Sequence, residues 1–399
     1  MVTSAAGSRA RAVPQWRWLT VLATCACLVG LDALVVSPLA PRITHEVGAP
    51  PRVGGLLVTA YALAYLVAGP VFGPLSDRWG RTRLMTLGLA VFAAGTAATG
   101  FGTNFIVLLG FRVLSGVGAA MLVPAILAHV SGQVQPRRRG AAIGVIVGAM
   151  MGASVAGVPA GAFLAGAVSW HWTFWGIGIA AAALLVPLTR LVPGGAPPVA
   201  AGDAPIRAAL GDAAVVYTLL CTFLWTAGLQ GMFANAGLFY ADNFGLSTGA
   251  VGLALAGGGA MSVAGNVCGG RLADAVGGRR VVAVATLVAA ASVLAFSLST
   301  GSLVAAVAVQ VVWGGAVGLG QSALTTLAGT LRPQARGTVL ALNSSLQYGG
   351  MMAGTAAAAA LLQADSPFWA VGALCSVCSA LVFPVVTVLL PVTTDSDPS

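Results

Sequence analysis

Long apolar runs alternate with short polar breaks along the whole chain. Each run holds about 20 residues, and a helix of that length crosses a hydrocarbon layer of about 30 Å at about 1.5 Å per residue. We place the runs at 17–40, 53–74, 84–102, 106–130, 141–168, 172–192, 212–238, 248–270, 280–300, 302–328, 337–363 and 367–391. The pattern therefore predicts an all-α membrane protein with twelve transmembrane helices.

The composition agrees with a lipid environment. Hydrophobic residues make up 58% of the 399 residues and charged residues 7%, whereas an average soluble domain carries about a quarter charged residues. The 54 glycines suit membrane helices, whose backbones pack closely together. We expect a multi-pass protein of the cell's inner (plasma) membrane, in contact with membrane lipids.

The arginines predict the orientation of the chain in the membrane. Sixteen of the nineteen lie in alternate loops or in the N-terminal tail, Arg42 and Arg52 lie on the other side, and Arg112 lies inside a span. Because basic residues accumulate in cytoplasmic loops, both termini are predicted to be cytoplasmic. The net charge of +9 is then a topology signal, and no nucleic-acid partner is expected.

The sequence offers no support for enzyme chemistry. The chain contains no lysine, which excludes a GxxxxGK[ST] phosphate loop and Schiff-base chemistry. His45, His129 and His171 stand apart in the sequence and are interpreted as loop or interface residues, so no metal site is expected. We expect neither a cofactor nor a catalytic residue.

A stretch rich in proline, glycine and alanine divides six spans from six. The predicted regions are a cytoplasmic N-terminal tail (1–16), an N-terminal six-helix bundle (17–192), a cytoplasmic linker (193–211), a C-terminal six-helix bundle (212–391) and a cytoplasmic C-terminal tail (392–399). Duplicated halves with a binding site at their interface are a known plan of membrane transporters.

A pattern of glycine, aspartate and arginine in the loop after span 2 returns after span 8, 197 residues later. The first copy holds Gly73, Leu75, Asp77, Arg78, Gly80, Arg81 and Arg83, and the second holds Gly270, Asp274, Gly277 and Arg279. The first copy matches G-x-L-x-D-R-x-G-R in full, and on this motif the chain resembles the major facilitator superfamily over essentially its whole length. The resemblance implies two pseudo-symmetric six-helix bundles that alternate in access, and we expect a functional monomer.

The chemistry of this loop motif predicts a gate. The glycines permit a tight turn between helices, while the aspartate and the arginines can pair with one another and with helix ends. Such contacts would hold the cytoplasmic mouth closed. The alternative is that the arginines only fix the topology of the chain.

One acidic and one basic residue lie deep inside predicted spans. Asp32 lies about 12 Å and Arg112 about 9 Å below the outer ends of spans 1 and 4, at about 1.5 Å per residue. A buried arginine usually faces a cavity or a partner, so we predict that the two side chains meet. The span 4 segment from Arg112 to Ala120 resembles a pattern of proton-linked family members. We predict that Asp32 carries protons and that Arg112 tunes its proton affinity; a static ion pair between spans 1 and 4 is the alternative.

Span 5 carries a run of glycines around one proline: Gly148, Gly152, Gly157, Pro159 and Gly161. Proline removes a backbone hydrogen bond and glycines allow bending and close packing, so this helix can act as a hinge or a seal. The run resembles the segment that distinguishes exporters and antiporters of the family. One departure matters, because Val158 separates Gly157 from Pro159, and this version resembles the sugar-efflux and chloramphenicol-resistance-like branch. Plain helix packing is the alternative.

Polar and aromatic residues within the spans predict a substrate cavity. The candidates are Tyr61, Tyr65, Met150, Met151, Trp225, Gln230, Phe233, Asn235, Gln310, Trp313, Asn343 and Gln347. An apolar pocket with a few polar groups suits an amphipathic organic substrate. Any one of these side chains can instead join two helices or anchor a helix at the membrane surface.

These observations predict a secondary transporter that exports a small organic molecule, such as a drug, an antibiotic or a metabolite, in exchange for protons. An uptake symporter or facilitator for a sugar or an amino acid would use the same scaffold. A membrane-embedded enzyme or a sensor is the third alternative, and the sequence shows neither a catalytic constellation nor a soluble signalling domain.

Overall fold

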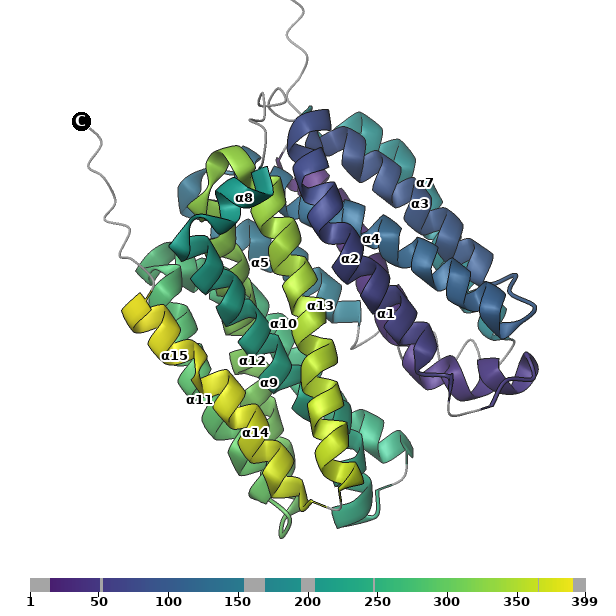
Figure 1. The fold of residues 1–399 in the computed structure, drawn as a ribbon, viewed down its shortest axis with the longest axis vertical. Coiled ribbons are helices and arrows are strands. Elements are labelled where there is room, and N and C mark those ends of the chain that lie inside the picture. The colour runs from purple at the N-terminus through teal and green to yellow at the C-terminus, as the bar shows by residue number, and fades with distance from the viewer. Residues whose placement is uncertain are drawn as a thin grey trace, which may run out of the picture.

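The computed structural model describes residues 15–50, 53–153, 169–194, 205–246, 248–364 and 366–389. The helices form two bundles that lie side by side (Figure 1). The first bundle contains α1 (Gln15–Glu46), α2 (Leu56–Trp79), α3 (Arg81–Thr99), α4 (Phe105–Gln133), α5 (Pro136–Gly152) and α7 (Trp170–Leu191).

The second bundle follows a short helix, α8 (Pro205–Leu210), which lies inside the predicted linker. It contains α9 (Ala213–Phe244), α10 (Thr248–Val276), α11 (Gly278–Leu298), α12 (Leu303–Leu331), the short η3 (Pro333–Ala335), α13 (Arg336–Gln363), α14 (Phe368–Ala380), α15 (Val382–Pro384) and η4 (Val385–Leu389). Nine segments of the described chain are long and apolar enough to cross a membrane.

Most predicted spans coincide with helices, but several helices run past the predicted span ends. We predicted a loop from Gly73 to Arg83, and this was wrong, because α2 continues to Trp79 and α3 begins at Arg81. Only Gly80 lies between them, with a φ of 93°. Gly277 divides α10 from α11 in the same way, with a φ of 91°. Polar residues predict where a span leaves the lipid, whereas α2 and α10 continue to a glycine that adopts a backbone conformation other residues disfavour.

Caps define other helix starts. The side chain of Asn104 accepts a hydrogen bond from the Val107 amide at 2.9 Å before α4, and Ser302 accepts one from the Ala305 amide at 3.3 Å before α12. These bonds satisfy backbone donors that the first turn of a helix leaves without a partner. Both predicted span boundaries lie within one residue of these starts.

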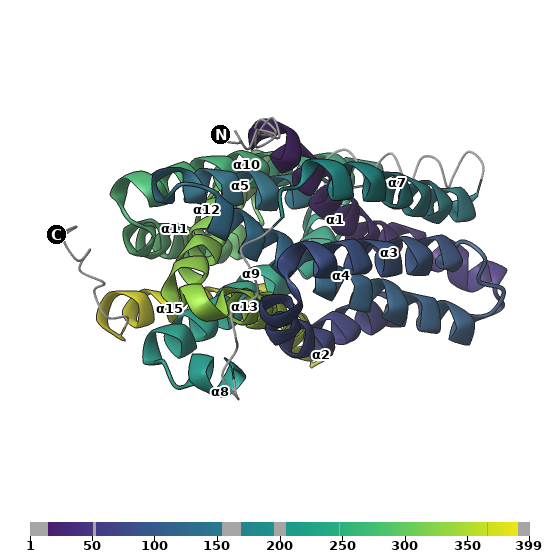
Figure 2. The same cartoon turned by 90° about the horizontal axis from the view of Figure 1, so that it is seen from above.

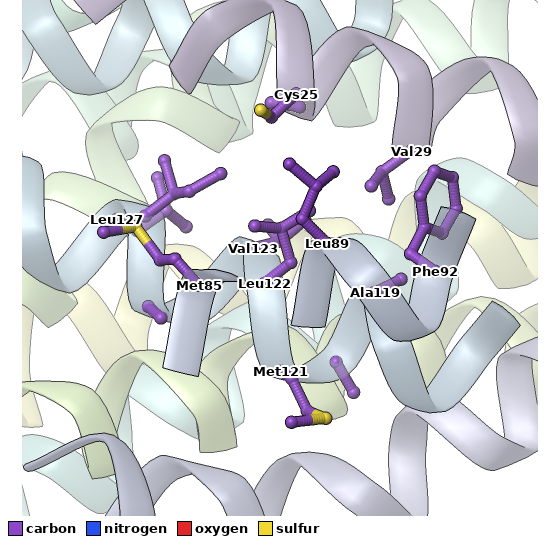
Figure 3. Close-up of a cluster of buried hydrophobic side chains, with 14 of the residues drawn as sticks. Cys25, Val29, Met85, Leu89, Phe92, Ala119, Met121, Leu122, Val123 and Leu127 are labelled. Carbon is purple, nitrogen blue, oxygen red and sulfur yellow. The ribbon is translucent and has the colours of Figure 1, made fainter. Parts of the chain in front are cut away.

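Small residues bring the helices of the first bundle into close contact. Figure 3 shows Leu89 and Phe92 of α3 beside Leu122 and Ala119 of α4, respectively, with Cys25 of α1 across from them. All five side chains are buried. At Gly118 of α4 a Cβ atom would overlap the backbone of α3, so glycine is required there for this helix spacing.

The two bundles touch mainly through two pairs of helices. Helix α2 packs against α13 and helix α5 packs against α10, and Figure 2 shows both pairs side by side when the molecule is seen from above. Glycines line both contacts: a Cβ at Gly73 would lie 2.6 Å from that of Ala341, and the backbones at Gly140 and Gly270 leave no room for a Cβ. The bundles meet at the end that carries Gly80 and Gly277, here named the motif end, and they diverge toward the opposite end (Figure 1).

Candidate functional site

A buried ion pair joins α1 to α4. The Nη1 atom of Arg112 lies 2.7 Å from Oδ2 of Asp32, and both side chains are completely buried. Arg112 also donates through Nε to the Leu57 carbonyl at 3.3 Å and through Nη2 to the Asp32 carbonyl at 3.4 Å. The predicted contact is therefore present. The second carboxylate oxygen, Oδ1 of Asp32, has no hydrogen-bond partner among the described residues.

Tyrosines connect this ion pair to the second bundle. The guanidinium carbon of Arg112 lies 4.6 Å from the centre of the Tyr61 ring, a favourable position for a cation over an aromatic face. The Tyr61 ring centre lies 6.3 Å from that of Tyr348, and the Tyr65 ring centre lies 4.2 Å from it. Tyr348 belongs to α13, so a continuous row of side chains runs from Asp32 across the bundle interface.

A narrow cavity lies beside this row and is formed by both bundles. Its lining residues come from α2, α4, α5, α12 and α13: Tyr65, Val123, Leu127, Ile146, Val147, Met150, Gln321, Thr325, Ser344, Gln347 and Tyr348. The free space is about 20 Å³, which is room for about one water molecule. A larger molecule therefore requires the bundles to move.

Only some of the predicted cavity residues reach this cavity. Tyr65, Met150 and Gln347 line it, and Tyr61 lies behind it, against Tyr348 and Arg112. Met151 follows in the same α5 helix and is half-buried.

The other predicted cavity residues belong to the second bundle and lie outside the cavity lining. Gln310 accepts a hydrogen bond from Tyr240, and Asn343 accepts one from Thr222 at 2.6 Å. Asn235 donates to the Gly231 carbonyl of its own helix at 2.8 Å. The remaining members are Trp225 against Gly320, Trp313 with its ring 6.3 Å from Phe233, and the half-buried Gln230.

The two motif aspartates cross the bundle interface in a symmetric manner. Asp77 of the first bundle accepts hydrogen bonds from the Gly337 and Thr338 amides at 3.0 Å each and from the Thr338 hydroxyl at 3.1 Å, at the start of α13. Asp274 of the second bundle accepts from the Gly140 and Ala141 amides at 2.8 and 2.9 Å, in the N-terminal half of α5. A carboxylate near a helix N-terminus is stabilised by the helix dipole, so both contacts favour closure of the motif end.

Arginines surround these aspartates. Arg81 lies 3.5 Å from Asp77 and donates to the Ala128 carbonyl at 3.0 Å. Burial lowers the pKa of Arg336 to about 10; the nearby Arg139 and Arg81 add to this effect and Asp77 opposes it. Burial also lowers the pKa of Arg139, against the pull of Asp274. Asp77 and Asp274 therefore partly offset the repulsion among the cationic side chains that lie together at the motif end.

The other arginines of the motif lie around this cluster. Arg78 lies in the last turn of α2, Arg83 lies in the first turn of α3, and Arg279 donates to the Thr387 carbonyl in η4. The Arg279 bond joins two helices of the second bundle, and among the described residues none of the three arginines forms a hydrogen bond or an ion pair across the interface.

The glycine run of α5 packs against α10. Gly148 lies 3.4 Å from the Val267 side chain and Gly152 lies 3.9 Å from that of Val263, measured from the position of an added Cβ atom. Gly157, Pro159 and Gly161 lie outside the described residues. The described part of the run is therefore a contact between the bundles, and its role as a hinge or seal stays a prediction.

One interpretation of the histidines was wrong. His129 is completely buried, its ring centre lies 5.8 Å from that of Trp18, and neither ring nitrogen has a hydrogen-bond partner among the described residues. The reason is that α4 continues to Gln133, so position 129 faces the bundle core. His45 is exposed in the last turn of α1, and Nε2 of His171, in the first turn of α7, lies 3.7 Å from Oε1 of Glu46.

Comparison with known proteins identifies the family. The family model described as Major Facilitator Superfamily matches residues 22–355 and 218–398. The chain belongs to the major facilitator superfamily. It is therefore a membrane transporter and not an enzyme, and its helices form the family's fold of two bundles with twelve helices.

Related proteins and structures agree with this placement. The chain is 28% identical to the MFS-type transporter YceJ of Bacillus subtilis over 86% of this chain and 89% of that protein. It is 28% identical to the chloramphenicol resistance protein of Streptomyces lividans over 64% of this chain and 66% of that protein. The crystal structure of the human organic anion transporter MFSD10 superposes with a TM-score of 0.78 at 20% identity, covering 95% of this chain and all of that one.

The sequence prediction missed several side chains around the cavity of this major facilitator protein. Tyr348, Gln321, Thr325 and Ser344 were not among the candidates, although each is a polar residue within a predicted span. The signal for Tyr348 was its place beside Gln347. Which face of α12 or α13 turns toward the first bundle does not follow from helices that are apolar on all sides.

Proposed function

We propose that this transporter exports a small amphipathic organic molecule in exchange for protons, and that Asp32 carries the proton. The observation that carries the proposal is the completely buried pair of Asp32 and Arg112, joined through Tyr61 and Tyr348 to a cavity that both bundles line. A buried ionisable pair in a membrane protein marks a functional site by default.

Protonation of Asp32 would change the contacts of Arg112. The neutral carboxyl group loses the ion pair at 2.7 Å, and a buried guanidinium without its counter-charge is unstable where it is. Arg112 lies over the Tyr61 ring and donates to the Leu57 carbonyl of α2. Helix α2 packs on α13 of the second bundle, so a shift of Arg112 would change the position of α2 against α13 and thereby favour movement of the bundles.

The arrangement of the bundles suits an exporter that has released its cargo. With both termini in the cytoplasm, the motif end is the cytoplasmic end, closed by Asp77 and Asp274. The ends that diverge in Figure 1 then face outward. In this state Asp32 takes up a proton from outside, and the return to the inward-facing state delivers that proton to the cytoplasm.

The relatives support this direction of transport. The Streptomyces lividans protein is named for chloramphenicol resistance, and export of the compound is one way for a transporter to give resistance. We further propose that the protein works as a monomer in the plasma membrane, without a cofactor, and draws its energy from the proton gradient.

The test uses purified protein in proteoliposomes with an imposed pH gradient and chloramphenicol as the first probe. Wild type is expected to collapse the gradient when the probe is added, and Asp32→Asn is expected to leave it intact. Asp242→Asn is the matched control, because this carboxylate lies near the end of α9 and is exposed. Probe movement without proton movement in the wild type would contradict the proposal and favour a facilitator.

A further inference from the structure

The charge inside the bundles constrains the cargo. We propose that this transporter carries molecules without a net charge, held by hydrogen bonds and ring contacts, and that it excludes permanent organic cations. This inference rests on the proposed proton-coupled export, which supplies the order of binding events used below.

The chain has ten acidic residues, and one of them lies inside the bundles. Asp77, Asp212 and Asp274 lie at the motif end, and Glu46 and Asp242 are exposed near the opposite ends of α1 and α9. Asp203, Asp365, Asp395 and Asp397 lie outside the described residues and outside every predicted span. The stretch 154–168 completes the predicted span 5, and its sequence contains no charged residue. Asp32 is therefore the acidic residue of the bundle interior.

That carboxylate is already neutralised. Arg112 lies 2.7 Å from Asp32, and both side chains are completely buried. The pair carries no net charge while Asp32 is ionised and a charge of about +1 when Asp32 is protonated. The buried His129 can only add positive charge. In neither protonation state of Asp32 does the interior offer a negative charge to a cationic substrate.

A cation in the cavity would therefore lack a counter-charge. The polar side chains of the lining are all uncharged: Tyr65, Gln321, Thr325, Ser344, Gln347 and Tyr348. Hydroxyl and amide groups both donate and accept hydrogen bonds, and the Tyr65 and Tyr348 rings, 4.2 Å apart, offer aromatic faces. Burying a charge without a partner costs several kcal/mol, whereas burying a hydrogen-bonded neutral molecule does not carry this penalty.

The order of binding in an antiporter selects neutral molecules over anions as well. In antiport the cargo binds while Asp32 is ionised, when the interior carries no net charge. An anion would instead bind best to the positive state, in which Asp32 is protonated, and would then travel together with the proton. A neutral cargo cannot compete with the proton by charge, so the two must communicate through Arg112, Tyr61 and Tyr348.

The experiment compares uncharged and permanently cationic probes on the full-length protein. Binding of chloramphenicol, thiamphenicol, ethidium and tetraphenylphosphonium is measured through the shift in melting temperature of the detergent-purified protein, and transport is measured in proteoliposomes. We expect an uncharged probe to bind at least about tenfold more tightly than either cation. Transport of either cation by the wild type overturns the inference, and so does a failure of both uncharged probes to bind.

A second arm adds the carboxylate that the cavity lacks. Gln347→Glu places a negative charge on a cavity-lining side chain of α13, and Gln321→Glu does the same from α12. We expect either variant to bind the cations about tenfold more tightly than wild type. Gln133→Glu, at the exposed end of α4, is the matched control and should leave cation binding unchanged. Equal gains in the control and the cavity variants contradict the inference.

The outcomes separate this inference from the proposed function. An uncharged probe that binds and moves without proton exchange supports the neutral cargo and contradicts proton coupling. A cation that exchanges for protons only when Asp32 is present supports the coupling and contradicts the neutral cargo.

Discussion

Asp77 contributes to the contact between the bundles at the motif end, and we expect its removal to have a calculable effect on the balance between conformations. Asp77 accepts three hydrogen bonds from the start of α13, at 3.0, 3.0 and 3.1 Å. A typical hydrogen bond contributes about 0.5–1.5 kcal/mol net. When the bundles separate at this end, water replaces part of that contribution, and asparagine retains one acceptor atom. Asp77→Asn should therefore favour the open motif end by about 1–2 kcal/mol, a change of about 5- to 30-fold in population.

Hydrogen exchange measures this change directly. The Gly337 and Thr338 amides donate to Asp77, so a peptide that begins several residues before them should exchange faster in Asp77→Asn, by about the same factor. Gly337→Ala is an independent way to break the contact, because its Cβ would lie 2.7 Å from the Asp77 carboxylate. It should reproduce the effect.

One further variant controls this experiment, and a second tests the symmetric contact. Asp212→Asn removes a carboxylate of the motif end that pairs with Arg332 at 2.7 Å within the second bundle, and it should leave the exchange of the α13 start unchanged. Asp274→Asn should speed exchange at Gly140 and Ala141. If Asp77→Asn and Asp212→Asn give the same exchange at Gly337, the reasoning is refuted.

Three further sets of substitutions test separate parts of the structure. Gly80→Ala and Gly277→Ala should each lower stability by about 1–2 kcal/mol, seen as a lower melting temperature, because both glycines have a φ near 90°. Gly110→Ala, in open space within α4, is the control and should not lower the melting temperature. Equal melting temperatures for all three variants contradict a requirement for glycine at the two turns. Gly270→Ala should prevent closure of the motif end, since its Cβ would overlap the Gly140 carbonyl. We expect faster hydrogen exchange of the Gly140 amide, and unchanged exchange contradicts this role of Gly270. Tyr348→Ala should lower the number of protons moved per cargo molecule, and Tyr348→Phe should leave it unchanged, because the ring makes the contacts with Tyr61 and Tyr65. Equal proton-to-cargo ratios in the two variants exclude the row of rings as the link between protons and cargo.

The fold was predictable because lipid imposes one rule on the whole chain. Every span must satisfy its backbone N–H and C=O groups by hydrogen bonds within a helix, so long runs of apolar residues predict helices such as α4 and α12. The ends were less predictable, because α2 continues through Ser76 and Asp77 to Trp79. A helix that leaves the lipid changes its composition there without ending.

The ion pair was predictable for a similar physical reason. Asp32 and Arg112 are the charged residues that sit deep in spans 1 and 4 at matching depths, and neither is stable in lipid without a partner. The cavity was harder to predict. Helices that are apolar on every side do not reveal which face meets a neighbour, so Gln310 and Asn343 could not be distinguished from Gln347 until their partners Tyr240 and Thr222 were placed.

The central claim is that Asp32 couples the movement of cargo to the movement of protons. The most direct measurement compares two activities of Asp32→Asn in proteoliposomes, exchange of labelled chloramphenicol at equal pH on both sides and its accumulation against a gradient driven by a pH difference. The account predicts that exchange survives and that driven accumulation is lost, because the bundles and the cavity remain but no proton is carried. Accumulation at the wild-type level in Asp32→Asn would contradict the account and leave Asp32 and Arg112 as a structural pair.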